Sequence, residues 1–122
     1  MPKQGRNRGQ ITAEGQSTPT VAVGAGWGAT GSAALSTGAN DVAGQVVVTA
    51  AGGTYAQATA TVTITFGTAY ATAPRAVLVT CVNAVSIDTG HVSYAVTTTA
   101  LTLTYKVLPA AGAYTFDYLC VA

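Results

Sequence analysis

The residues that come closest to a catalytic set lie in one short stretch, which holds Ser86, Asp88 and the only histidine, His91. A nucleophilic triad needs a histidine between a hydroxyl or thiol and an orienting carboxylate, and these groups usually come from separated elements. Here all three share one predicted hairpin loop with an Asp-Thr-Gly turn. We therefore interpret them as turn residues with a histidine at the loop tip, and the sequence predicts no catalytic residues and no enzyme.

A Gly-x-Gly-x-x-Gly pattern is formed by Gly26, Gly28 and Gly31 around the only tryptophan, Trp27. In a dinucleotide-binding fold, such glycines let a tight turn present backbone N–H groups to a pyrophosphate at a helix start. Here no helix is predicted to follow, and no acidic residue lies about 20 positions further on. The pattern is therefore interpreted as a packed or flexible loop, and we expect no bound cofactor.

The remaining candidates for chemistry are carboxylates and thiols. The carboxylates stand singly along the chain: Glu14, Asp41, Asp88 and Asp117. This spacing favours neither the paired carboxylates of a glycoside hydrolase nor a calcium-binding loop. Cys81 and Cys120 lack both the spacing and the histidine partners of a zinc site, so no metal is expected. Two interpretations of the cysteines stay open, namely small buried hydrophobes or a disulfide between neighbouring strands.

The elements that must position these side chains have the pattern of β-strands. From Ala58 to Phe66 the sequence alternates apolar residues with threonine, which predicts a strand with one buried face. The other predicted strands are 20–23, 32–35, 45–50, 75–82, 91–97, 101–108 and 114–121. Segment 75–82 is an almost continuous apolar run, which predicts a strand covered on both faces. With no helical pattern, the chain is predicted to be all-β, as an antiparallel β-sandwich or jelly roll of about seven to eight strands.

Charge is scarce, since only 7% of the 122 residues are Asp, Glu, Lys or Arg. The outward face of the predicted strand 58–66 carries threonines where a soluble domain usually carries Lys and Glu. A neutral hydroxyl face indicates a surface that contacts protein more than bulk water. The length allows one domain, which we place at residues 20–122, after an extended basic N-terminal arm at residues 1–19.

The arm contains three of the five basic residues: Lys3, Arg6 and Arg8. In an extended segment these charges could contact nucleic acid or an acidic protein surface, and a solvated tail is the alternative. They resemble the start of a signal peptide, but no apolar segment follows them. No apolar run is long enough to span a bilayer, so we expect no membrane partner and a protein made in the cytoplasm.

Aromatic residues are the remaining candidates for recognition. Tyr105, Tyr114 and Tyr118 occupy inward positions of predicted strands, where they would pack in the core or between subunits. Other aromatic residues lie in or beside predicted loops and could form a surface recognition patch with nearby polar residues. The members of this predicted patch are Trp27, Tyr55, Tyr70, Asp88 and His91. Core packing is the favoured role for each aromatic residue considered alone.

Three stretches occur in an order and spacing that resemble a known family. They are Gly38–Gln45, Thr61–Thr80 with its Ala-Pro-Arg-Ala-Val-Leu-Val-Thr ending, and the closing Tyr114–Val121. Together they make residues 32–122 similar to the small β-sandwich domains of tailed-bacteriophage virion proteins. Such domains occur at the C-termini of tail fibres and in head fibres and capsid decoration proteins.

The resemblance implies a non-enzymatic virion component, commonly a homotrimer. No shaft, coiled coil or collagen-like repeat precedes the β domain, which favours a capsid decoration protein on the outside of the shell. The arm would then contact the acidic outer surface of the shell, so the expected partners are the major capsid protein and sister subunits rather than nucleic acid. The alternative is a receptor-binding tail-fibre tip, in which loops with Tyr55, Tyr70 and residues 86–91 would contact a host surface glycan.

Overall fold

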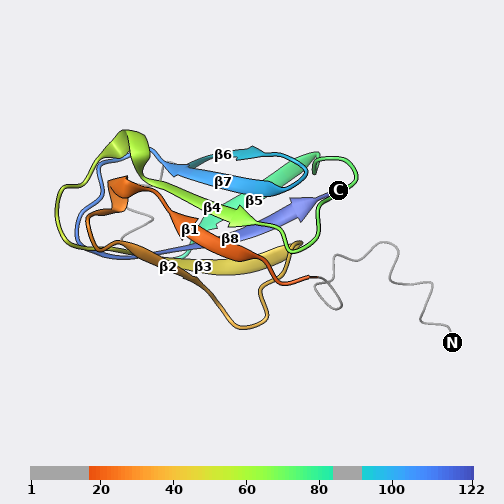
Figure 1. Ribbon diagram of the computed structural model, residues 1–122, viewed down its shortest axis with the longest axis horizontal. Coiled ribbons are helices and arrows are strands. Elements are labelled where there is room, and N and C mark those ends of the chain that lie inside the picture. Colours follow the sequence, from red (N-terminus) through yellow and green to blue (C-terminus); the bar gives the residue numbers. More distant parts are fainter. Residues whose placement is uncertain (1–16, 84–91) are drawn as a thin grey trace, which may run out of the picture.

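Two four-stranded antiparallel sheets lie face to face in the computed structural model, which describes residues 17–83 and 92–122 (Figure 1). Sheet A has the strand order β1-β4-β7-β6, and its strands are β1 (Thr20–Val23), β4 (Thr61–Thr65), β7 (Ala100–Tyr105) and β6 (Val92–Val96). Sheet B has the order β2-β3-β8-β5, and its strands are β2 (Ser32–Leu35), β3 (Ala43–Ala50), β8 (Gly112–Val121) and β5 (Ala76–Cys81). The prediction of an all-β, sandwich-like fold is confirmed.

Each of the segments predicted as strands contains a strand, and the differences lie at their ends. β4 begins at Thr61 rather than at residue 58, because Gln57–Thr59 forms a 3-10 turn, η3. β3 begins earlier than predicted, at Ala43, because it stays paired with β8 as far as Leu119. Alternation in the sequence therefore locates a strand, whereas the strand's ends depend on where its neighbour stops.

The core lies between the sheets and is built from the alternate residues that each strand points inward. The prediction that Tyr105, Tyr114 and Tyr118 face inward is confirmed, since each is at most 2% exposed. Burial of apolar area is the main force that holds the sheets of a sandwich together, about 10 Å apart. The largest fully buried side chains are Trp27, Tyr105, Phe116, Ile64, Leu101, Leu103, Val46, Val48 and Val62.

Trp27 closes one end of this core from the 3-10 turn η2 (Ala25–Trp27). Its indole ring stacks on Tyr105 with 5.5 Å between ring centroids, and it meets the edge of Tyr114 at 5.1 Å. Its Nε1–H donates a hydrogen bond of 3.0 Å to the carbonyl oxygen of Thr61. The indole therefore buries its whole surface while its one polar group keeps a partner.

The glycine pattern around Trp27 serves this packing. Gly28 has φ of +104°, and a Cβ there would lie 2.0 Å from the carbonyl oxygen of Ala51. The backbone of this turn is bonded to the β3–β4 loop, because the N–H of Ala51 donates to the carbonyl oxygen of Trp27 at 3.0 Å. Close approach between two backbones, together with a left-handed residue, is what requires glycine at position 28.

β5 differs from the expectation that both of its faces are covered. Val77 points into the core and is buried, whereas Leu78 is 58% exposed and Val82, just after the strand, is 43% exposed. The reason is that the described residues form two sheets, and Leu78 points away from the other sheet. An apolar run indicates burial on both faces only where a layer packs against each face of the sheet, so the prediction for this segment is wrong.

Cys81 and Cys120 lie on the paired strands β5 and β8, but they do not face each other. In the antiparallel register Cys81 is opposite Phe116, and Cys120 is opposite Val77. The two residues therefore carry thiols rather than a disulfide. Cys120 is buried in the core, so its interpretation as a small buried hydrophobe is confirmed.

The end of the sandwich where β1 begins is the end opposite to Trp27. The β2–β3 loop, the β4–β5 loop and the C-terminus gather there (Figure 1). The first described residue, Ser17, lies at this end, and Pro19 is buried against the sandwich. The last three residues of the predicted arm are thus packed on the body, and the arm boundary at residue 19 lies inside this packed segment.

Candidate functional site

A buried aspartate organises the end of the sandwich at which the described chain begins. Asp41 is only 3% exposed. Its Oδ1 accepts a hydrogen bond of 2.7 Å from the backbone N–H of Gly67, and its Oδ2 accepts one of 2.9 Å from Thr68. A carboxylate that leaves water without such partners would be costly to bury. The two bonds therefore tie the β2–β3 loop to the β4–β5 loop.

The neighbouring Asn40 explains why Asp41 points inward. The Oδ1 of Asn40 accepts hydrogen bonds from the backbone N–H of Val42 at 2.8 Å and of Ala43 at 3.0 Å. This is a local turn made by an asparagine side chain, which reverses the backbone immediately before β3. The carbonyl oxygen of Asn40 in turn accepts the Tyr118 hydroxyl at 2.6 Å, which fixes the turn to the core side of β8.

The backbone of Asp41 holds the first described residues in place. Its N–H donates to the carbonyl oxygen of Ser17 at 3.0 Å, and the Ser17 and Thr68 hydroxyls are hydrogen-bonded to each other. Gly67 lies so close to this segment that a Cβ there would be 2.6 Å from the carbonyl oxygen of Thr18. We call this assembly the arm root, and its members are Ser17, Thr18, Pro19, Asp41, Gly67 and Thr68.

Three titratable side chains surround Asp41 from the core side. Burial raises the pKa of Tyr70 to about 12 and that of Cys120 to about 11, and it also raises the pKa of Tyr118. The negative charge of Asp41 adds to all three increases. At neutral pH these groups are protonated, so the Cys120 thiol is not a thiolate nucleophile. Tyr70 instead donates its hydroxyl hydrogen to the carbonyl oxygen of Asp41 at 2.7 Å.

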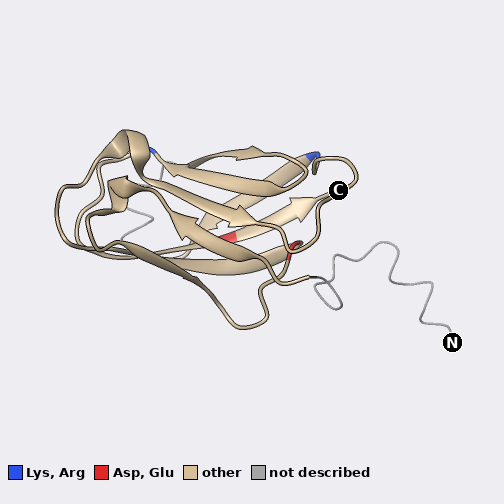
Figure 2. Cartoon of the chain, in the orientation of Figure 1, with Lys and Arg blue, Asp and Glu red and all other residues tan. Residues whose placement is uncertain are grey.

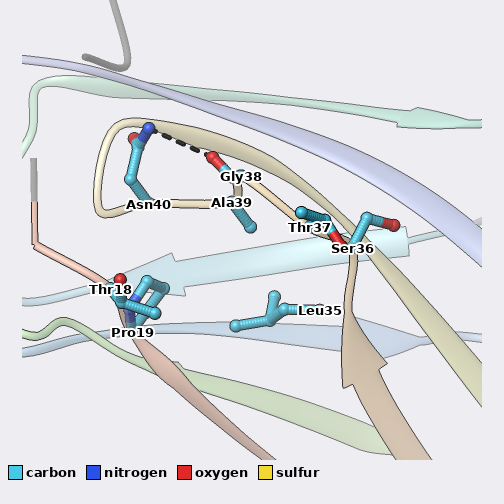
Figure 3. Close-up of a pocket in the computed structure, with 8 residues that line it drawn as sticks. All are labelled: Thr18, Pro19, Leu35, Ser36, Thr37, Gly38, Ala39 and Asn40. Carbon is cyan, nitrogen blue, oxygen red and sulfur yellow. Dashed lines mark hydrogen bonds between the residues drawn. The ribbon is translucent and has the colours of Figure 1, made fainter.

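A hollow of about 450 Å³ lies beside the arm root, between Thr18 and Pro19 on one side and the β2–β3 hairpin on the other (Figure 3). The hairpin contributes Leu35, Ser36, Thr37, Gly38, Ala39 and Asn40. None of the residues that line the hollow carries a charge. Hydroxyl and backbone groups can hydrogen-bond a neutral chain or ligand here, but the hollow offers no charged side chain that would hold an ion.

The structure does not bring the predicted recognition residues together. Trp27 has no exposed surface, and Tyr55 packs beside Gly28 at the same end of the sandwich. Tyr70 lies at the opposite end, where its ring meets the edge of Phe66 and its hydroxyl is bonded to Asp41. The other predicted site residues lie outside the described residues, and these are Lys3, Arg6, Arg8, Asp88 and His91.

The residues that organise the arm root are ones for which the sequence had suggested only a turn. The run Gly38-Ala39-Asn40-Asp41 has turn chemistry, and it is a turn in the structure. What the sequence does not disclose is that the aspartate turns inward to cap Gly67 and Thr68, which lie far along the chain. An Asn-Asp pair directly before a strand would be the signal to look for.

Charge is sparse over the part of the chain that the structure describes, where the charged residues are Asp41, Arg75, Lys106 and Asp117 (Figure 2). Arg75 and Lys106 are exposed and stand at different elements, before β5 and after β7. Within residues 17–83 and 92–122, no three metal-ligating side chains lie close enough to hold an ion. Asp41 of the arm root is therefore the one buried charged side chain among the described residues.

Comparisons of the chain with protein-family models, with curated proteins and with solved structures gave no match. Over the described ranges, no helix has the length and apolar character needed to cross a membrane. Function must therefore be inferred from the chain's own residues, and the arm root is a site at which polar contacts join three separate segments at one buried aspartate.

Proposed function

We propose that this chain is a non-enzymatic structural protein of a tailed-bacteriophage virion. In this proposal it decorates the outside of the capsid as a homotrimer, and its basic N-terminal arm anchors it to the major capsid protein. The sequence resemblance of residues 32–122 to virion β-sandwich domains supports the class of protein. The arm root supports the mode of attachment.

The single observation that carries the proposal is that Ser17, where the predicted arm joins the body, is held in place by hydrogen bonds. An anchor fixes the orientation of the body only if non-covalent contacts hold its junction with the body in addition to the covalent link. Here Asp41 binds Ser17 through its backbone and the β4–β5 loop through its carboxylate. The residues that precede Ser17 contain the three clustered basic charges, Lys3, Arg6 and Arg8. A basic segment that leaves from a braced junction suits attachment to an acidic surface.

The sparse charge of the body is the second support. A soluble antiparallel sandwich usually presents charged residues on the outward faces of its strands. In this chain the outward residues are Thr61, Thr63 and Thr65 on β4, and they are Ala100, Thr102 and Thr104 on β7. A neutral surface of this kind suits a protein that is surrounded by sister subunits and shell protein.

A deletion of residues 1–16 tests the proposal, because it leaves Ser17 and every described contact of the arm root in place. The full chain should bind capsid shells that were assembled without this protein. The deleted chain should keep its far-ultraviolet circular dichroism spectrum but no longer bind these shells. Replacement of Lys3, Arg6 and Arg8 by serine keeps the length of the arm and should also weaken binding. Binding of the unsubstituted chain should fall steeply as the salt concentration rises, whereas any binding left in the serine variant should not. Shell binding retained after the deletion would refute the anchor.

The same experiment distinguishes the tail-tip alternative. A receptor-binding module would keep its ligand contacts in the body, so the deleted chain would still bind host cells or surface polysaccharide. Tyr55 and Tyr70 lie at opposite ends of the described body, and Trp27 is buried. This distribution provides no aromatic platform for stacking on a sugar, and it makes the capsid role the better supported of the two.

A further inference from the structure

The outward residues of sheet B form rows that run across its strands. The register places Ala43, Leu119 and Leu78 in one row. A second apolar row contains Val47 and Val82, which both align with Thr115 of β8. Leu78 is 58% exposed and Val82 is 43% exposed, and both are among the most exposed large hydrophobic side chains of the described body. The outer face of sheet B is thus unusually apolar for a surface open to water.

A polar row lies between the two apolar rows, and its side chains are bonded to one another. The Ser36 hydroxyl donates to the Oε1 of Gln45 at 3.3 Å, and the Nε2 of Gln45 donates to the Oδ1 of Asp117 at 2.9 Å. Gln45 and Asp117 are directly opposite each other on β3 and β8. Asp117 is the one charged residue that the described strands place on this face, and its carboxylate already accepts a hydrogen bond from Gln45.

The outer face of sheet A provides a comparison within the same molecule. Its strands present threonine, serine and alanine, as in the row that joins Ala22, Thr63 and Thr102. No leucine, isoleucine or valine points outward from the strands of this sheet. The large exposed aliphatic side chains on strand faces therefore belong to sheet B, which makes the two faces chemically different.

We propose that copies of this chain associate with one another through the outer face of sheet B. This inference rests on the proposed homotrimer and names the surface that its subunits would share. With strands about 4.8 Å apart, the face covers roughly 400–500 Å². A face of that size is comparable to the patches that mark interaction sites, and it is about half of what one partner contributes to a standard interface of ~800 Å² per side. In a homotrimer each subunit would turn this face toward the three-fold axis and meet both sister subunits there.

Charge identifies the occupant as a second copy rather than the shell. A surface that attracts the basic arm is acidic, so it would repel Asp117 and leave a carboxylate desolvated beside leucine and valine. A second copy brings a face whose one charged side chain on the described strands, Asp117, is already hydrogen-bonded to Gln45. The Gln45 amide has two N–H donors, and one of them donates to Asp117 of its own subunit. The other can donate to Asp117 of the partner subunit.

The order of the rows makes the face complementary to itself. Passing along the strands, an apolar row is followed by the polar row and then by the other apolar row. The order is the same in both directions, so a second copy can set apolar rows against apolar rows in either orientation. Around a three-fold axis that runs along the strands, each row would lie at the same height in all three subunits, so apolar rows would meet apolar rows as a cyclic homotrimer requires.

Light scattering of the full chain in solution tests the inference. We expect a mass of three times the 12.1 kDa of one chain. Leu78→Lys and Leu119→Lys each place a cation in an apolar row, so each should weaken association about tenfold or more and yield folded monomers. Leu78 is at an exposed strand edge, so the Leu78→Lys chain keeps its core contacts, and its thermal unfolding should remain cooperative.

Two matched variants make the result specific. Leu108→Lys changes a leucine that is equally exposed, at 58%, but lies in the β7–β8 loop, and Thr102→Lys puts the same charge on sheet A. Both should leave the mass unchanged. A monomeric full chain, an unchanged mass for Leu78→Lys, or equal losses in the control variants would overturn the inference. An oligomer that depends on Leu78 but binds no shells would refute the proposed function and leave this interface standing.

Discussion

The carboxylate of Asp41, in the β2–β3 loop of sheet B, accepts a hydrogen bond of 2.7 Å from the backbone N–H of Gly67, in the β4–β5 loop that connects sheet A to sheet B. The same aspartate donates its own N–H to Ser17, at the start of the described chain. One buried residue thereby couples the connection between the sheets to the position at which the described chain begins. The structural predictions below follow from this coupling and from the core that surrounds it.

Replacement of Asp41 should destabilise the fold and loosen the arm root together. Asp41→Ala leaves the N–H groups of Gly67 and Thr68 without their acceptor, and each bond to a charged group contributes about 1.5–3 kcal/mol. We expect a loss of about 3–5 kcal/mol in the free energy of unfolding, measured by urea denaturation. Asp41→Asn keeps one acceptor oxygen and should lose about half as much. Equal stability of Asp41→Ala and the native chain would contradict the role of this carboxylate.

Gly67→Ala should displace the arm root by steric contact. Its Cβ would meet the Thr18 carbonyl oxygen at 2.6 Å, which is backbone and cannot rotate away. We expect faster cleavage near Ser17 in limited proteolysis, with a stability loss of about 1–3 kcal/mol. Gly38→Ala is the control, because φ of +90° strains an alanine there although nothing lies within 4 Å. A similar cleavage rate in both variants would indicate general strain rather than a specific contact.

Trp27 should behave as a core residue. Trp27→Ala removes the ring stacked on Tyr105 and should cost about 3–5 kcal/mol, as for other buried tryptophans. Trp27→Phe keeps most of the ring contact but loses the bond to Thr61, so its cost should be smaller. Tyr55→Ala, at a partly exposed aromatic, should cost less than either. Urea midpoints measure all three, and a native-like midpoint for Trp27→Ala would show that the indole is not part of the core.

Stability should fall at alkaline pH. Burial raises the pKa of Cys120 from 9.0 to about 11 and that of Tyr70 from 10.0 to about 12, so the folded chain holds these protons more tightly than the unfolded chain. The stabilisation is complete below about pH 9, and it is lost as the pH rises through the raised values. The urea midpoint, measured between pH 7 and pH 11, should therefore decrease above about pH 9.

The cysteine that causes the first part of this decrease can be identified by substitution. Cys120→Ala removes the group with the lower pKa, so the decrease should begin closer to pH 10, where tyrosine in the unfolded chain ionises. Cys81→Ala is the control and should leave the onset near pH 9. A flat profile up to pH 11 in the native chain would show that these groups ionise equally in the folded and unfolded states.

The sequence was sufficient to predict the strands, because alternation of apolar and polar residues reports directly which face a strand buries. It gave the inward direction of Tyr105, Tyr114 and Tyr118 for the same reason. It could not show that the outward face of the segment containing Leu78 is uncovered, because an apolar residue has the same identity whether a neighbour covers it or not. That difference is set by which layers pack against each face of the sheet.

The candidate site was harder to predict, because its contacts join residues distant in the sequence. Asp41 and Gly67 look like two ordinary loop residues until the sheets bring their loops together. Trp27 lies in a glycine-rich segment, which made it a possible member of a recognition patch, although core packing was the favoured role for each aromatic residue alone. The glycines instead let its backbone approach the β3–β4 loop, and the indole fills the core.

The measurement that tests the central proposal most directly is the location of this chain on intact virions, by gold-labelled antibodies or particle imaging. The proposal predicts label distributed over the whole outer surface of the capsid, and loss of that label from particles assembled with the chain that lacks residues 1–16. Label confined to the tail tip, or no label on washed virions, would contradict it.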